Sequence, residues 1–368
     1  MSFAVHSPDT PEEGLKRLLT SLLKNGRVSG VFSLAKVEGG KLAYELITDP
    51  GKIAGSAPLH SLMPVNLGQL LNRFTMMGPS PEPIAVVIRP CELRAFVETV
   101  KRRISHLDNL FFISHTCGGV FTLKSSLDTD IERRMPGYWK KVRANDIHPE
   151  LRTTCQSCVE YIPYTADVTL RVVDGAGSFE AIADTERGKR LISGLGFDEG
   201  EGALDRTRLD GLLAKRTTRR EEAFAQEAAK PGLDGLIAQF GKCVGCHACR
   251  QACPICYCSL CTFESNIFEK RPEDHKRELE VKGGTRLPPD TVFFHLGRMM
   301  HMAVSCVACG SCSDVCPVSI PVALTFKRVG ESLQKSFDYS PGKDVMQPVP
   351  VGTFEPEEFV DIEGAKSR

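Results

Sequence analysis

Hydrophobic and polar positions in the first half of the chain predict helices and strands in alternation. Apolar side chains recur at helical spacing in several segments. Between them lie short continuous apolar runs, which are typical of strands buried on both faces of a sheet. Helices are expected over residues 15–23, 64–74 and 92–100, and strands over residues 28–34, 84–88 and 110–114. This alternation predicts an α/β (α+β) domain with a partly parallel sheet.

The second half of the chain has few strand-forming runs. Residues 208–229 are charged and alanine-rich and predict a solvated helical connector, whereas residues 291–303 place phenylalanines and methionines at helical spacing. Proline recurs after residue 339, which predicts an extended tail. We expect an α/β domain at residues 1–204, a helical linker at 205–235, an all-α domain at 236–338 and the tail at 339–368.

Two cysteine runs in the helical half share one spacing. Each follows the pattern Cys-x2-Cys-x2-Cys-x3-Cys-Pro, which is the bacterial ferredoxin signature for [4Fe–4S] clusters. The first run holds Cys243, Cys246, Cys249 and Cys253, and the second holds Cys306, Cys309, Cys312 and Cys316. The doubled spacing predicts that the all-α domain is a helical dicluster ferredoxin, and it disfavours zinc knuckles or buried free thiols.

The spacing also predicts how the ligands divide between two clusters. In two-cluster ferredoxins, three thiolates of one run bind one cluster and the fourth cysteine binds the other. We therefore assign Cys243, Cys246, Cys249 and Cys316 to a first cluster and Cys306, Cys309, Cys312 and Cys253 to a second. Clusters whose irons all carry thiolates transfer electrons and bind no substrate.

Composition narrows the class of partner and the setting. The formal net charge is zero, so no global field attracts nucleic acid, and no nucleic-acid partner is expected. The sequence contains no apolar run of ~18 residues that would span a membrane, and it does not begin with the pattern of a signal peptide. The cysteine spacings suit metals rather than disulfides, which predicts a reducing, cytoplasmic and anaerobic setting.

Four further cysteines lie in the first half of the chain. Cys91 and Cys117 follow predicted strands, and Cys155 and Cys158 form a Cys-x2-Cys pair. Sites in parallel sheets gather at the carboxyl ends of strands, so these residues are candidates for one site. From the spacing alone, that site could be a zinc ion, a third [4Fe–4S] cluster or a redox dithiol.

Each of these cysteines lies in a short motif. The motifs are Pro90-Cys91-Glu92, Thr116-Cys117-Gly118-Gly119, and Cys155-Gln156-Ser157-Cys158 leading to Ala166-Asp167. Together they resemble the beta-subunit family of coenzyme F420 hydrogenases and dehydrogenases. The chain is most similar to the formate dehydrogenase type, which also appends a dicluster ferredoxin domain and shares the cysteine-rich run at residues 253–261. The resemblance implies a third [4Fe–4S] cluster on Cys91, Cys117, Cys155 and Cys158.

The same resemblance bears on a flavin. Beta subunits of this family carry FAD, and some use it to pass a hydride to F420. The resemblance implies Asn66, Gly118, Gly119 and Asp167 as the FAD-binding residues of this chain. Two of the family's glycine-bearing segments are replaced here, because the first predicted helix opens with a single glycine at Gly14 and residues 168–173 contain none.

Three cysteines have no place in these sets. Cys256, Cys258 and Cys261 could be buried structural thiols, ligands that exchange into a cluster, or part of a further site, and we prefer structural thiols. Met299, Met300 and Met302 are expected to fill the core rather than to bind metal. His295 and His301 are expected to be packed or exposed rather than to be ligands.

These observations predict an iron–sulfur electron-transfer subunit rather than a stand-alone catalyst. It would relay single electrons through three [4Fe–4S] clusters, between a catalytic subunit and another redox module. The expected partners are redox subunits of a hetero-oligomeric complex of formate dehydrogenase, hydrogenase or heterodisulfide reductase type. The alternative is an FAD-containing subunit that itself oxidises or reduces F420 or NAD(P)H. A zinc-stapled scaffold without redox work is the third possibility.

Overall fold

The computed structural model describes residues 2–128, 131–228, 232–265, 271–284, 291–350 and 352. The strands are β1 (Ser2–Ser7), β2 (Gly30–Lys36), β3 (Leu42–Ile47), β4 (Ile84–Val87), β5 (Leu110–His115), β6 (Val168–Leu170), β7 (Phe179–Ala183) and β8 (Asp198–Gly202). The α-helices of the first half are α1 (Pro11–Lys24), α2 (Leu67–Thr75), α3 (Pro90–Lys101), α4 (Leu123–Asp128), α5 (Met135–Arg143), α6 (Thr153–Gln156) and α7 (Glu186–Ile192). Those of the second half are α8 (Arg206–Ala228), α9 (Gly232–Phe240), α10 (Ala248–Gln251), α11 (Pro272–Lys282), α12 (Thr291–Met302), α13 (Ser311–Asp314) and α14 (Val322–Ser336).

The strands form one mixed sheet in the order β3-β2-β4-β5-β6-β7-β1-β8. The central strands β2, β4, β5 and β6 are parallel, as the alternation of helices and strands predicts. The neighbours β3, β7, β1 and β8 pair antiparallel. The predicted α/β class with a partly parallel sheet is therefore confirmed, and the antiparallel strands β1, β3, β7 and β8 are additions that the hydrophobic pattern did not predict.

Helices cover both faces of the sheet. Ala85 and Val87 of β4 pack in the core that contains the apolar face of α1, whereas Ile84 and Val86 pack in the core shared with α2 and α3. Successive side chains of a strand point to opposite faces, so a strand covered on both sides is apolar throughout. All four residues of β4 are buried, which confirms the interpretation of this run as a doubly buried strand.

The helix boundaries follow local capping. The predicted helix at residues 64–74 begins only at Leu67, because the side chain of Asn66 accepts a hydrogen bond from Gly68 N at 3.0 Å and caps the helix. Pro90 occupies the first turn of α3, where its missing N–H costs nothing. This helix start places Cys91 directly at the carboxyl end of β4.

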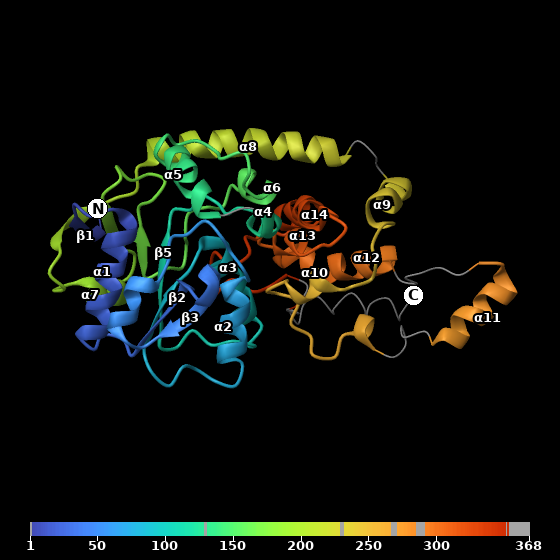
Figure 1. The fold of residues 1–368 in the computed structure, drawn as a ribbon, viewed down its shortest axis with the longest axis horizontal. Helices are drawn as coiled ribbons and strands as arrows, with labels where there is room; N and C mark the ends of the chain where they lie inside the picture. Colours follow the sequence, from blue (N-terminus) through green and yellow to red (C-terminus); the bar gives the residue numbers. More distant parts are fainter. Residues whose placement is uncertain are drawn as a thin grey trace, which may run out of the picture.

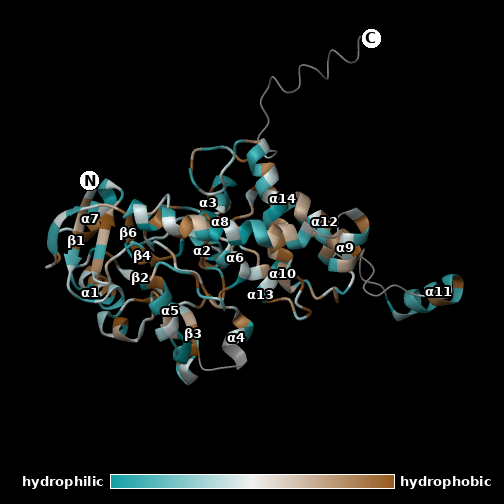
Figure 2. Ribbon diagram, turned by 90° about the horizontal axis from the view of Figure 1, so that it is seen from above, coloured by the Kyte–Doolittle hydropathy of each residue, from teal (hydrophilic) through white to brown (hydrophobic). Residues whose placement is uncertain are grey.

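The second half is helical, as predicted, and packs around its own core. Figures 1 and 2 show the sheet at one end of the molecule and α9, α10 and α12 at the other, while α8 runs along the molecule between them. Phe240, Val292, Met299, Met302 and Phe326 belong to this core. Met300, in contrast, is exposed on α12. No helix in the described ranges is long and apolar enough to cross a membrane.

Helix α8 is not the fully solvated connector that its composition predicts. Leu209, Leu212 and Arg216 are each at most 2 % exposed. The composition of α8 does not indicate this narrow buried stripe, because many residues of the helix are charged and only a few face inward. The stripe lies against the α/β half, since the guanidinium of Arg216 donates to the carbonyl oxygens of Cys117 and Gly118, both at 3.1 Å.

Candidate functional site

The two cysteine loops of the helical half follow the same backbone path. The first has left-handed residues at Gly245 (φ +65°) and His247 (φ +54°), and the second at the matching positions Ala308 (φ +55°) and Gly310 (φ +86°). Each loop then enters a short helix, α10 or α13, and these two helices contact each other. Left-handed backbone is costly for residues other than glycine. Its recurrence at matching positions indicates that the shape of the loop is itself required.

The first predicted ligand set lines one small cavity. The cysteines in the cavity wall are Cys243, Cys246, Cys249 and Cys316. Backbone amides point at two of the sulfurs, since Gly245 N donates to Cys243 Sγ at 3.4 Å and Ile320 N donates to Cys316 Sγ at 3.3 Å. Burial raises the pKa of Cys249, and the three neighbouring thiols raise it further. The structure thus brings the four predicted ligands together, although Cys316 comes from the second run.

The second predicted set is assembled across both runs. Burial raises the pKa of Cys312 well above its usual value, and the nearby thiols of Cys253, Cys309 and Cys306 act in the same direction. Burial also raises the pKa of Cys253 to about 12, with a contribution from Cys309 of the other run. Cys253 therefore lies among the thiols of the second run.

The third set is built at the carboxyl edge of the parallel strands. Cys91 lies in the first turn of α3 after β4, Cys117 follows β5, Cys155 is on α6 and Cys158 follows that helix. Burial raises the pKa of Cys91 well above its usual value, and Cys309, Cys117 and Cys155 are among the neighbours that add to this shift. Burial raises the pKa of Cys155 to about 11, and Cys117 and Cys158 contribute. All four cysteines are therefore near neighbours, and one thiol of the second set lies close to them.

Single metal ions and iron–sulfur clusters require different spacings of the thiolate sulfurs. Within the described part of the chain, no three His, Cys, Asp or Glu side chains converge on the position of one metal ion. A zinc ion would draw each thiolate sulfur to about 2.3 Å from one point. A cubane cluster instead spaces four thiolates around a cage of four irons. Each of the three cysteine sets contains the four thiols that one such cluster requires.

Two buried arginines beside the cysteine sets show whether these sites suit a negatively charged group such as a thiolate-bound cluster. Arg216 and Arg298 are 1 % and 2 % exposed, and no carboxylate in the described residues forms an ion pair with either. Arg216 contacts the Cys117 carbonyl, and Arg298 donates to Cys249 Sγ at 3.1 Å. An unpaired buried charge is strongly unfavourable. Thiolates that carry an iron–sulfur cluster would supply the missing negative charge at both places.

The wall of the first cavity contains a second unsatisfied group. His295 lines this cavity and is 1 % exposed, and neither of its ring nitrogens has a hydrogen-bond partner. Its ring stacks on Phe240 with 4.3 Å between centroids. Burial lowers the pKa of His295 to about 4, so the ring is neutral and keeps one N–H. A buried donor is normally satisfied, and an acceptor bound in the cavity would satisfy this one.

A buried ion pair joins the third set to the second cysteine loop. Arg152, just before α6, pairs with Asp314 of α13 at 2.6 Å and donates to the Cys309 carbonyl oxygen at 3.2 Å. The Thr154 side chain also lies close to Gly310, because a Cβ added to this glycine would lie 2.3 Å from Thr154 Oγ1. These contacts fix the α/β half against the loop that carries the second set.

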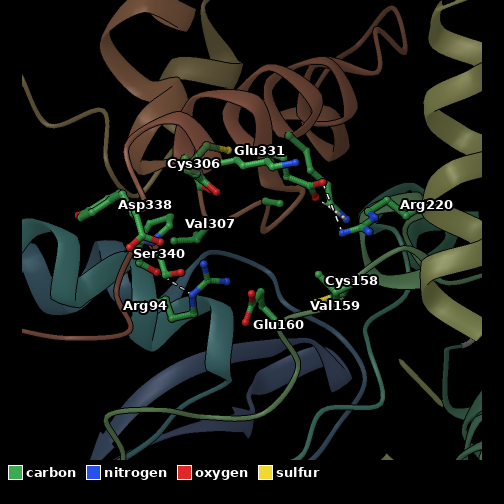
Figure 3. A pocket seen from close by; sticks show the side chains of 16 residues that line it. Arg94, Cys158, Val159, Glu160, Arg220, Cys306, Val307, Glu331, Asp338 and Ser340 are labelled. Carbon is green, nitrogen blue, oxygen red and sulfur yellow. Dashed lines mark hydrogen bonds and ion pairs between the residues drawn. The ribbon is translucent and has the colours of Figure 1, made fainter. Parts of the chain in front are cut away.

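A cavity of about 290 Å³ lies between these two sets (Figure 3). Cys158 of the third set and Cys306 of the second set both line it. Lys327 also lines the cavity and is 5 % exposed; its ammonium donates to the carbonyl and hydroxyl oxygens of Ser157. The cavity therefore borders both the second and the third set, and it lies between α14 and the α/β half.

The residues implied for FAD have local structural roles. Asn66 caps α2, and its Nδ2 is buried without a partner. Asp167, which precedes β6, accepts hydrogen bonds from Phe112 N at 3.0 Å and from the Thr185 hydroxyl at 2.8 Å. Gly118 packs against Tyr138, since an added Cβ would lie 2.4 Å from its hydroxyl oxygen. Gly119 has φ +101° beside Cys155, so both glycines shape the third cysteine site.

The three unassigned cysteines lie around a further arginine, Arg250. Arg250 forms an ion pair with Glu264 at 2.7 Å and donates to the Cys258 carbonyl oxygen at 2.6 Å. Burial opposes the charge of Arg250, but a hydrogen bond to Cys261 and the nearby Cys256 help to raise its pKa. Cys258 is exposed and Cys256 is partly buried beside the core of the helical half. The cysteine-rich run is thus folded around Arg250.

Sequence reasoning missed the cations of the site. Arg298, Arg216, Lys327 and Arg152 come from four separate segments. One of them left a signal, because Arg298 is the single Lys, Arg, Asp or Glu in the otherwise apolar helix α12. The other three lie in charged segments, where nothing local distinguishes a buried cation from a solvated one.

The fold and the paired cysteine loops define an iron–sulfur protein in which an α/β half is joined to a dicluster half. Residues 217–320 match the family of 4Fe-4S dicluster domains. The chain is 26% identical over 365 residues to the F420-dependent formate dehydrogenase subunit beta of Methanocaldococcus jannaschii, covering 89% of this chain and 90% of that protein. It is 28% identical over 373 residues to the F420-dependent formate dehydrogenase 1 subunit beta of Methanococcus maripaludis, covering 91% and 92%.

These findings confirm the resemblance predicted from the sequence. Over most of its length the chain is similar to beta subunits of F420-dependent formate dehydrogenases, and its C-terminal part matches a dicluster domain. A solved F420-reducing [NiFe] hydrogenase complex from Methanosarcina barkeri has a chain that is 13% identical, with a TM-score of 0.44 over 62% of this chain and 93% of that one. A similarity of that size supports no conclusion about the fold.

Proposed function

We propose that the chain is an electron-transfer subunit that carries three [4Fe–4S] clusters in a row. Such clusters accept and release single electrons when bound to four thiolates. The chain's own residues hold them: the third set at the edge of the sheet, the second set in the α13 loop and the first set in the α10 loop. Buried cations beside each set offset the negative charge that the thiolates bring.

The observation that carries this proposal is the order of the three sets in space. The second set neighbours both of the others, since Cys309 is close enough to Cys91 to influence its pKa and Arg298 lies near both Cys249 and Cys312. The first and third sets are therefore joined through the second. This order supports a relay in which electrons enter at one end of the chain and leave at the other.

The proposal extends to partners and to the division of the chain. The named relatives are subunits of formate dehydrogenases, so we propose that this chain also joins a complex of redox subunits. The partner types that suit its chemistry are formate dehydrogenase, hydrogenase and heterodisulfide reductase modules. We also propose the four parts at residues 1–204, 205–235, 236–338 and 339–368, in which the first holds the third cluster and the third holds the other two.

Iron and acid-labile sulfide in the anaerobically purified chain test the proposal. We expect about twelve irons and twelve sulfides per chain, because each cubane site holds four of each. The change Cys155→Ser should remove about four irons and leave the signals of the other two clusters intact. The matched control is Cys258→Ser, which changes an exposed thiol outside the three sets. Fewer than about eight irons in the unaltered chain would contradict the dicluster assignment.

A second candidate is an FAD-containing subunit that exchanges a hydride with F420. The names of the relatives favour it, and so does the buried Asn66 Nδ2 that lacks a partner. It predicts flavin absorbance in the purified chain and oxidation of reduced F420 or NAD(P)H by that chain. A preparation that contains all the iron but stays inactive after addition of FAD would exclude it.

A further inference from the structure

Arg298 lies between the first and second cysteine sets. Its Nη1 donates to Cys249 Sγ and its Nη2 donates to the Cys249 carbonyl oxygen, both at 3.1 Å. Burial opposes the charge, but the neighbouring thiols of Cys249, Cys253, Cys312 and Cys256 raise the pKa of Arg298 above its usual value. One guanidinium is therefore shared by thiols of both predicted clusters.

The surroundings of Arg298 leave those thiols as its main source of negative charge. The side chain is 2 % exposed, and no carboxylate among the described residues pairs with it. The rings of Phe294 and Phe326 lie 5.6 and 5.2 Å from the guanidinium carbon and hold it in an apolar setting. A charge in such a setting acts strongly on its neighbours, because few polar groups screen it.

We infer that Arg298 sets the reduction potentials of the first and second clusters, on the basis of the function proposed above. Each reduction adds one electron from the neighbouring cluster in the relay and changes no covalent bond. A fixed cation and a hydrogen bond to a ligand sulfur stabilise the more negative, reduced form, and both therefore raise the potential. Cys249 Sγ receives both effects, whereas the second set receives only the charge.

The geometry predicts unequal effects on the three clusters. The first cluster depends most on Arg298, the second depends on it less, and the third is expected to be independent of it. The third set has cations of its own, since Arg216 contacts Cys117 and Lys327 contacts Ser157. The potential of the third cluster therefore serves as an internal reference in the same sample.

Two substitutions separate the charge from the hydrogen bond. Arg298→Gln removes the charge and keeps a donor, whereas Arg298→Lys keeps the charge on a side chain without the planar fork. The control is Arg17→Gln, which removes the same charge from an exposed arginine over Phe197. Each full-length variant is purified anaerobically, its iron and sulfide are counted, and its clusters are titrated electrochemically with detection by electron paramagnetic resonance.

We expect full iron content in both variants. With Arg298→Gln, the first cluster's potential shifts to more negative values, the second shifts less, and the step that Cys155→Ser abolishes stays in place. With Arg298→Lys, the shift at the first cluster is smaller. Unchanged potentials in an iron-replete Arg298→Gln protein overturn the inference, and so does an equal shift with Arg17→Gln. Loss of iron in both variants also overturns it, in favour of a role in assembly. Low iron in the unaltered chain would instead count against the proposed function itself.

Discussion

The hydroxyl of Tyr339 donates a hydrogen bond of 2.5 Å to the carboxylate of Glu98 in the interior of the molecule. Glu98 lies on α3, whose first turn contains Cys91 of the third set. Tyr339 follows α14 of the helical half. The same carboxylate oxygen accepts Gly342 N at 2.9 Å, and Arg102 links Glu98 to Ser305. The segment at the start of the expected tail is thus bound to α3 of its own chain and ties the two halves together.

Loss of this hydrogen bond should destabilise the protein. Tyr339→Phe leaves a fully buried carboxylate with one partner fewer, and we expect a loss of about 1–3 kcal/mol in the free energy of unfolding. Denaturant unfolding of the anaerobic chain measures it. The matched control is Tyr164→Phe, which removes a tyrosine–glutamate hydrogen bond at a 44 % exposed ring. Equal losses in the two variants would contradict the importance of the buried pair.

Glu98 also predicts how stability depends on pH. Although burial alone would raise it, the pKa of Glu98 is lowered by the hydrogen bonds from Tyr339 and Ser305 and by Lys101 and Arg102. A carboxyl whose pKa is lowered on folding stabilises the protein above its unfolded pKa, and this contribution fades as the pH falls through the folded pKa. The difference in stability between the unaltered chain and Glu98→Gln should therefore shrink below about pH 4.5, near the unfolded value.

His60 should also make the protein less stable at acidic pH, because the folded protein binds a proton at this side chain less readily than the unfolded chain does. Burial lowers its pKa to about 4, and the side chain is 5 % exposed. As the pH falls below about 6.5, His60 is protonated in the unfolded chain before it is protonated in the folded protein. The free energy of unfolding should therefore fall progressively between about pH 6.5 and 4, by roughly 2–3 kcal/mol in total. His60→Gln should flatten the pH profile over this window. His301→Gln, at an exposed position, is the control substitution.

The sequence predicts best those features that depend on short stretches of chain. The two cysteine runs are visible because three ligands of a cluster come from one loop, and the strand at residues 84–88 is visible because a doubly covered strand is apolar throughout. The strands β1, β3, β7 and β8 were not predicted. Both partners of β1 lie far from it in the sequence, so nothing local indicates that pairing. The strand β8 is also largely exposed and acidic, which gives no strand pattern.

Contacts between the halves of the molecule have no local signature. Glu98 and Tyr339 are far apart in the sequence, and a glutamate is rarely fully buried. Arg216 is hidden among the charges of α8 and Lys327 among those of α14. Arg298 is the exception, because a single arginine in an apolar helix is unusual. Even there, the sequence cannot name the thiol that it contacts, since Cys249 precedes it by a long insert.

The assignment of the fourth cysteine of each run to the other run's cluster gives a distinct prediction. If Cys253 binds the second cluster, Cys253→Ser should alter the same paramagnetic signal as Cys306→Ser and leave the signal that Cys243→Ser alters. The physical reason is the position of Cys253 among Cys309 and Cys312, which raises its pKa together with burial. Electron paramagnetic resonance of the reduced variants decides the point. Loss of the Cys243-dependent signal would mean that each run binds its own cluster.

The ion pair between Arg152 and Asp314 should couple the stability of the two halves. Its side chains are 3 % and 6 % exposed, so Arg152→Met leaves an uncompensated buried carboxylate. We expect a loss of about 3–5 kcal/mol, most of it recovered by adding Asp314→Leu, because the cost comes from the unpaired charge rather than from the missing pair. Denaturant unfolding of the two single variants and the double variant measures the coupling. Arg219→Met breaks an exposed pair and should cost less than about 1 kcal/mol. Additive losses in the double variant would show that the two residues act independently, and the contact between the third cysteine set and the second loop would then need another explanation.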